Sequence, residues 1–87
     1  MVYIYAIYSK KTKRIYVGQT ENIERRLKEH NNGLTKSIKF YIPWNLFYYE
    51  KTKDRKEARK KELYYKSGCG KEKLRVILKE FLSRPHS

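Results

Sequence analysis

The sequence predicts an α+β fold: a small three-stranded antiparallel sheet covered by helices, with the element order β-β-α-β-α-α. Three observations predict this class. Two β-branched and aromatic segments flank a polar turn near the N-terminus, helix-capping residues open two later segments, and the last segment carries an apolar stripe at helical spacing. A length of 87 residues suits one domain with one modest core. We assign this single domain to residues 1–83 and expect a frayed tail at 84–87.

The first two strands are predicted to form a hairpin. Residues 2–8 (VYIYAIY) and 14–19 (RIYVGQ) are typical of strands, and the short polar segment between them is typical of a turn. If Ser9 pairs with Arg14, Tyr5 lies opposite Gly18 and diagonal to Tyr16, on one face of the sheet. A register shifted by one residue would place the two tyrosine rings on opposite faces.

The middle of the chain predicts one helix and the third strand. Thr20 or Asn22 can serve as the N-cap of a helix over residues 23–31, and Gly33 suits the left-handed position after its end. Residues 34–45 are predicted to be irregular, because they are mostly polar and Pro43 is unsuited to a central strand. The third strand is expected at residues 46–50.

The last third of the chain predicts two more helices. Asp54 and Glu57 form a capping-box pattern that opens a helix running to about Lys66. The sequence SGCG at 67–70 is expected to separate this helix from a final one over residues 71–82. A stripe at i, i+3, i+4, i+7 and i+8 predicts that the final helix packs on the core through Leu74, Ile77, Leu78, Phe81 and Leu82.

Charge is the strongest compositional feature. Twenty-two Lys and Arg residues against nine Asp and Glu residues give a net charge of +13, which favours a nucleic-acid partner. A basic solubilising surface remains the alternative interpretation. No segment combines a basic face with an apolar face suited to a lipid surface, so we expect no membrane partner. The single Cys69 excludes an internal disulfide, and the absence of a signal peptide or long apolar run favours a cytoplasmic location.

Three polar residues fall on helix positions that point toward the sheet. At about 100° per residue, Arg26 and His30 stack at the edge of the apolar stripe of the first helix, whereas Glu29 points to solvent. An arginine at such an edge needs a partner with negative charge. Two alternatives fit: a structural carboxylate of the protein, or a bound phosphate. Glu62 lies among the inward positions of the second helix. It is interpreted either as the ion-pair partner of Arg26 or as an oxygen ligand for Mg²⁺.

The hairpin tyrosines are the remaining candidate site residues. For any one tyrosine in a strand, packing in the core is the ordinary role. Tyr5 and Tyr16 are different, because they converge on the arginine, histidine and glutamate just described. A phenol beside cations loses its proton more easily, and it can orient or deprotonate a water molecule. These two tyrosines are therefore candidates for a functional site as well as for the core.

The same residues resemble the GIY-YIG nuclease domain, in particular its small stand-alone bacterial members. The two half-motifs correspond to YIY at 3–5 and YVG at 16–18, with an eleven-residue step from Tyr5 to Tyr16. Tyr3 replaces the glycine of the first half-motif. Three later segments resemble the first helix, the third-strand region and the second helix of the family: residues 22–31, 43–50 and 57–68. The resemblance covers residues 2–80.

The resemblance implies an endonuclease that hydrolyses phosphodiester bonds with one divalent ion, Mg²⁺ or Mn²⁺. Glu62 matches the metal-binding glutamate of the family, and Arg26 matches the arginine that offsets charge in the transition state. Tyr16 or Tyr5 is expected to activate the attacking water, with His30 hydrogen-bonded within this set. The expected contacts to the nucleic-acid backbone come from Arg14, Gly18, Lys36 and Lys39.

Three hypotheses about function follow. The first is a metal-dependent endonuclease acting on DNA, with weak sequence preference or selectivity for DNA structure and a role in DNA repair or recombination. The second is a non-catalytic nucleic-acid-binding module with the same fold. The third is a small basic protein that docks on RNA assemblies. A protein partner is a further expected source of specificity, because so small a domain has little surface for sequence readout.

Overall fold

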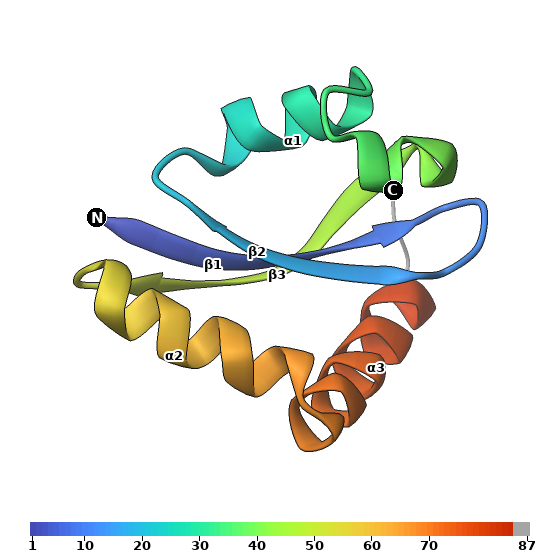
Figure 1. Cartoon of the computed structure of the whole chain (residues 1–87). Coiled ribbons are helices and arrows are strands. Elements are labelled where there is room, and N and C mark those ends of the chain that lie inside the picture. The colour runs from blue at the N-terminus through green and yellow to red at the C-terminus, as the bar shows by residue number, and fades with distance from the viewer. Residues whose placement is uncertain (85–87) are drawn as a thin grey trace.

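The computed structural model describes residues 1–84 and shows an α+β fold with the predicted order of strands and helices (Figure 1). Of the predicted tail, residues 85–87 lie outside the described residues, and Arg84 is the C-cap of the last helix. The elements are β1 (Val2–Ser9), β2 (Ile15–Thr20), α1 (Ile23–Asn31), the 3₁₀ helix η1 (Lys36–Tyr41), β3 (Trp44–Thr52), α2 (Arg55–Lys66) and α3 (Gly68–Ser83).

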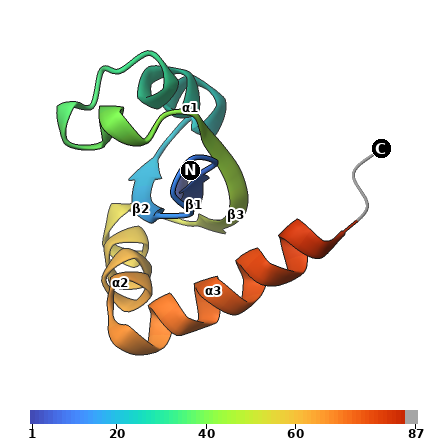
Figure 2. The ribbon, with the colours of Figure 1, turned by 90° about the vertical axis from the view of Figure 1, so that its right-hand side faces the viewer.

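The sheet is antiparallel and has the strand order β2-β1-β3, so β1 is the central strand and β2 is an edge strand. The predicted hairpin register is confirmed: the Ser9 amide donates to the Arg14 carbonyl at 2.9 Å, and Tyr5 lies opposite Gly18. Helix α1 and η1 cover one face of the sheet, and α2 and α3 cover the other (Figure 2). The sheet therefore separates two small cores.

The core on the side of α2 and α3 is the larger one. It takes alternate residues of β1 together with the inward side chains of the two helices, among them Ile4, Ala6, Tyr65, Leu74 and Leu78. The predicted stripe of the last helix is confirmed for four of its five positions, since Ile77 and Phe81 pack against this cluster. It is wrong for Leu82, which is 40% exposed because the helix there runs beyond the edge of the core.

The core on the side of α1 is built from Tyr5, Ile7, Ile38 and Trp44. Trp44 is 2% exposed, its indole N–H donates to the Ile38 carbonyl, and its backbone amide donates to Oδ1 of Asn31. The sequence predicted that residues 34–45 are irregular, and this prediction is wrong. The contacts of Trp44 explain the difference. They order η1 and extend β3 back to Trp44.

The helix boundaries follow the capping residues. Asn22 caps α1 and Asp54 caps α2, each accepting a hydrogen bond from the backbone amide three residues later, and Gly33 has a φ of 78° as predicted. The predicted break at residues 67–70 is too long. Ser67 alone separates α2 from α3, and it caps α3. Gly70 permits the tight junction, because a Cβ there would lie 2.6 Å from Cα of Tyr65.

Candidate active site

Tyr5, Tyr16 and His30 meet on the face of the sheet covered by α1. The Tyr5 and Tyr16 rings are 6.4 Å apart between centroids, and the His30 ring lies 5.9 Å from the first and 5.2 Å from the second. The two tyrosines project from neighbouring strands because the hairpin register places them diagonally on one face. Of the three residues, Tyr16 is only partly buried, so it is the one open to a water molecule.

Gly18 creates the space that the Tyr5 phenol occupies. A Cβ at Gly18 would lie 2.6 Å from the hydroxyl oxygen of Tyr5 and 2.9 Å from its Cζ, both far inside van der Waals contact. The sequence interpretation had assigned this space to an approaching phosphate. The structure corrects the physical reason for the glycine, because the phenol of Tyr5 fills the space next to the backbone.

His30 is fully buried and has a partner at each ring nitrogen. Its Nε2 lies 2.8 Å from the Tyr5 hydroxyl, and its Nδ1 lies 3.0 Å from the hydroxyl of Thr35. Burial, assisted by the nearby charge of Arg26, lowers the pKa of His30 to about 4. The imidazole is therefore neutral at neutral pH, so one nitrogen donates a hydrogen bond while the other accepts one.

Tyr5 is harder to deprotonate than a free phenol. Burial raises the pKa of Tyr5 to about 12, and this effect outweighs the opposing hydrogen bond and charge of Arg26. The expectation that neighbouring cations ease proton loss is therefore wrong for Tyr5. The charges of Tyr16 and Glu62 add to the rise in the pKa of Tyr5.

Arg26 is about one-third exposed and is paired with a residue of its own helix. Its Nη1 lies 3.0 Å from Oε1 of Glu29, and the Glu29 hydrogen bond, more than the contact with Tyr5, raises the pKa of Arg26. The structural carboxylate considered for Arg26 is thus Glu29, which was predicted to point to solvent and is only partly exposed. An i, i+3 spacing brings the two side chains together, and the side chains remain 36% and 32% exposed.

Glu62 is held by α2 at the edge of β2. Its Oε1 accepts a hydrogen bond from Nε2 of Gln19 at 3.0 Å, and its Oε2 lies 2.7 Å from Nζ of Lys66. Burial acts to raise the pKa of Glu62, but the hydrogen bonds from Lys66 and Gln19 outweigh it and lower the pKa below the usual range. Glu62 is therefore ionised at neutral pH and is paired with Lys66 and Gln19 rather than with Arg26.

Gln19 is the site residue that the sequence interpretation missed. It also accepts a hydrogen bond from Nη1 of Arg55 at 3.1 Å, so it links β2 to two positions of α2, Arg55 and Glu62. The alternation of side chains along a strand could have indicated it. Gly18 faces the α1 side of the sheet, so Gln19, the next residue, faces the α2 side, where Glu62 lies. Figure 2 shows α2 lying along that side of β2. The candidate site thus spans the edge of β2.

The donor set is compatible with one hard divalent ion. Within residues 1–84, no group of three or more histidine, cysteine, aspartate or glutamate side chains could hold a metal ion. Mg²⁺ does not need such a group, because it keeps several waters and often binds through one or two carboxylates plus substrate phosphates. The ionised Glu62 provides such a carboxylate, once Lys66 moves away from Oε2.

Of the predicted backbone-binding residues, Gly18 lies inside this site against Tyr5, whereas Arg14, Lys36 and Lys39 are exposed residues outside it. Lys36 and Lys39 are exposed on η1, on the α1 side of the sheet, beside Phe40, which is 74% exposed. Arg14 is exposed just before β2, and its Cζ lies 4.9 Å from the centroid of the Tyr41 ring. The exposed Phe40 was not singled out from the sequence, although it directly follows Lys39.

The fold and this set of residues define a nuclease-type domain. A family model described as the GIY-YIG catalytic domain matches residues 1–75, and the chain belongs to this family of nucleases. Members of the family act on nucleic acid and generally use divalent metal ions. Among the described residues, no helix combines the length and apolar character needed to cross a bilayer.

The chain is also similar to small bacterial proteins. It is 37% identical over 78 residues to a UPF0213 protein of Clostridium perfringens, covering 88% of this chain and 83% of that protein. It is 41% identical over 64 residues to a UPF0213 protein of Bacillus licheniformis, covering 72% and 66%. For a UPF0213 protein of Staphylococcus saprophyticus the identity is 36% over 76 residues, covering 86% and 92%. No solved structure matches the chain significantly.

Proposed function

We propose that this protein is a metal-dependent endonuclease that hydrolyses phosphodiester bonds in DNA with little sequence specificity. The observation that carries the proposal is the convergence of Tyr5, Tyr16, Arg26 and His30 on one face of the sheet, with an ionised Glu62 at the adjacent edge of β2. These side chains come from four different elements, so local sequence alone does not account for their meeting.

In the proposed mechanism, Tyr16 positions the attacking water, because it is the more exposed of the two tyrosines. Tyr5 stays protonated and, with neutral His30, fixes the position of the Tyr16 ring. Water attacks phosphorus and loses a proton to solvent, while the bond to the leaving oxygen breaks and that oxygen takes a proton from solvent. Arg26 offsets the negative charge that accumulates on the phosphoryl oxygens. Glu62 would hold the divalent ion, which supplies Lewis-acid stabilisation when bound.

Both charged groups must exchange partners for this chemistry. Arg26 would leave Glu29 for the phosphoryl group, and Glu62 would leave Lys66 for the ion. The first exchange costs little, because an ion pair with both partners about one-third exposed is worth roughly 0–1 kcal/mol. A doubly charged ion is in turn a stronger partner for Glu62 than a lysine that is itself half-exposed.

The same pairs favour one second candidate, a nucleic-acid-binding module without catalysis. Arg26 and Glu62 have satisfied partners within the protein, as purely structural residues would. The two candidates differ in what Glu62 does. A catalytic protein needs it as a metal ligand, whereas a binding module is unaffected or binds more tightly when this negative charge is removed.

The test is cleavage of fluorescent branched, flapped, single-stranded and duplex DNA, and of RNA, with Mg²⁺, Mn²⁺ or EDTA. We expect cleavage of at least one DNA substrate, dependent on the ion. Glu62→Gln and Arg26→Ala should each reduce the rate by about 100-fold or more, while the circular dichroism spectrum stays unchanged. Glu72→Gln, at an exposed carboxylate on α3, is the matched control and should cleave like the wild type.

No cleavage of any substrate, together with unchanged DNA affinity in Glu62→Gln, would support the binding module instead. Cleavage of RNA alone would overturn the choice of DNA. Cleavage that continues in EDTA at the same rate would overturn the role of the ion. A function in DNA repair or recombination remains a prediction that requires genetic tests beyond this assay.

A further inference from the structure

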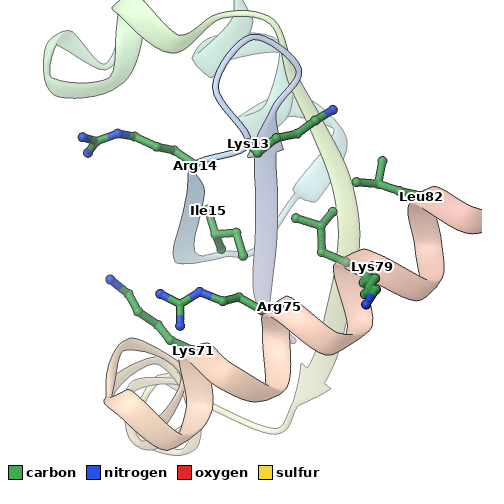
Figure 3. Close-up of a pocket in the computed structure, with 8 residues that line it drawn as sticks. Lys13, Arg14, Ile15, Lys71, Arg75, Lys79 and Leu82 are labelled. Carbon is green, nitrogen blue, oxygen red and sulfur yellow. The ribbon is translucent and has the colours of Figure 1, made fainter.

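A basic groove lies on the other side of the molecule, between the turn of the β1–β2 hairpin and helix α3 (Figure 3). Its volume is about 530 Å³. Five cationic side chains line it, two from the hairpin and three from successive turns of one face of α3: Lys13, Arg14, Lys71, Arg75 and Lys79. We call these residues and the space between them the hairpin–α3 groove.

The charge of this groove is largely uncompensated. Within residues 1–84, Arg75 is the one lining cation with a carboxylate partner, Glu72 at 3.2 Å, and both members of that pair are well exposed. Lys13 lies 5.6 Å from the Tyr8 ring and Arg14 lies over the Tyr41 ring, contacts that leave their charges in place. The three cations of α3, with Lys13 and Arg14 on the hairpin side, favour a chain of phosphates over a single carboxylate.

The size and floor of the groove indicate one strand. Its volume falls within the range of roughly 300–1,000 Å³ typical of small-ligand sites, so a duplex could only lie across its mouth. Ile15 and Leu78 form an apolar floor, which suits sugar rings, and the described lining contains no aromatic ring on which a base could stack. Contacts of this kind follow the backbone and do not distinguish one sequence from another.

Arg14 connects the groove to the candidate active site. It lines the groove, yet its guanidinium lies 4.9 Å from the centroid of the Tyr41 ring, and Tyr41 packs against the core on the α1 side. Only Ile15 separates Arg14 from Tyr16 in the chain. A strand that leaves Tyr16 along the edge of β2 therefore reaches Arg14 first and then the cations of α3.

We propose that the hairpin–α3 groove binds the phosphate backbone of a single nucleic-acid strand that extends from the cleavage site. The inference rests on the proposed nuclease function, since it states where the substrate continues beyond the reacting phosphate. The proposal also gives a role to the three cations of α3, which belong neither to the candidate active site nor to the core.

The test measures binding of a fluorescent 12-nucleotide oligothymidylate in EDTA, so that the result does not depend on cleavage. The groove variant is Lys71→Gln/Arg75→Gln/Lys79→Gln. The control is Lys53→Gln/Lys56→Gln/Lys60→Gln, which removes the same charge from exposed positions just before α2 and in its first half. At 50 mM salt we expect at least a tenfold loss of affinity in the groove variant and less than a threefold loss in the control.

Salt dependence gives a second readout. Each phosphate contact with a single strand contributes about −0.7 to the slope of log affinity against log salt, so three lost contacts should reduce the slope by about 2. Wild-type affinity for a 12-base-pair duplex should be lower than for the single strand. For the duplex, the affinity of the groove variant should be at most threefold lower than that of the wild type.

Several results would overturn the proposal. Equal losses in the two triple variants would mean that overall charge alone binds the strand. Equal losses for single strand and duplex would mean that the groove does not select one strand. Amide chemical shifts of α3 that respond as strongly to thymidine monophosphate as to the 12-mer would indicate a small-anion site. Failure of the cleavage assay with the binding pattern intact would contradict only the nuclease function.

Discussion

The hydroxyl of Tyr5 lies 2.8 Å from Nε2 of His30, and both side chains are almost completely buried. A strand and a helix that are 25 residues apart in sequence are joined by this contact. Burial holds the histidine neutral and keeps the phenol protonated, and the contact ties the first half-motif to the helix that carries Arg26.

Stability should fall below neutral pH because His30 is buried in its neutral form. Its pKa is about 4 in the folded protein and about 6.5 when unfolded, so the unfolded state binds more protons between these values. Stability is therefore lost as pH falls through this window, by about 2 kcal/mol between pH 7 and pH 5. Urea unfolding at several pH values measures the change.

The control for this prediction is His30→Gln, which retains hydrogen-bonding capacity but does not titrate. Its free energy of unfolding should vary much less between pH 7 and pH 5 than that of the wild type. Glu50 and Glu62 also have lowered pKa values, but their stabilisation is lost only as pH falls below their unfolded value of about 4.5. An equally steep pH dependence in the variant would contradict the role assigned to His30.

Gly18→Ala should destabilise the protein, because the new methyl group would overlap the Tyr5 hydroxyl. We expect a loss of about 1–3 kcal/mol, typical of overpacking in a core, measured by urea unfolding. Gly68→Ala is the matched control, since a Cβ there meets nothing within 4 Å and lies in the first turn of α3. In a Tyr5→Phe background the cost of Gly18→Ala should be smaller; an unchanged cost would place the clash elsewhere.

Glu50→Ala should be unusually destabilising for a partly exposed carboxylate. Its Oε2 accepts hydrogen bonds from Tyr65 at 2.5 Å and Tyr48 at 2.8 Å, and Lys61 lies 3.1 Å from Oε1. Removing it leaves two phenols without an ionised acceptor, so we expect a loss of about 2–3 kcal/mol in thermal or urea unfolding. Glu72→Ala, which breaks an exposed pair, should change stability by less than about 0.5 kcal/mol.

Lys66→Met should reduce the divalent ion concentration needed for half-maximal cleavage. Lys66 occupies Oε2 of Glu62 at 2.7 Å, so it competes with an ion for that oxygen. Releasing a pair worth up to 1 kcal/mol predicts a shift of roughly two- to fivefold, measured in a Mg²⁺ titration and by Mn²⁺ binding in electron paramagnetic resonance. Lys60→Met, at an exposed position of the same helix, should leave the titration unchanged. A higher ion requirement in Lys66→Met would argue against this competition.

Much of the fold could be predicted from local patterns. The hairpin register followed from the length of the turn, and the starts of α1 and α2 followed from Asn22 and Asp54, because caps and turns depend on residues close together in sequence. The segment before β3 could not be predicted this way. Its order depends on Trp44 contacting Asn31 and Ile38, and those contacts exist only in the assembled fold.

The sequence by itself determined which residues are candidates for chemistry. A helical period of 3.6 and a strand period of 2 place Arg26, His30 and Glu62 on inward positions and Tyr5 beside Tyr16. Only the tertiary structure decided the state of these groups. Burial sets the pKa of Tyr5 and His30, and the pairing of Arg26 with Glu29 and of Glu62 with Lys66 depends on distances between side chains in three dimensions. Periodicity gives a direction for each side chain, whereas desolvation and pairing depend on everything packed around it.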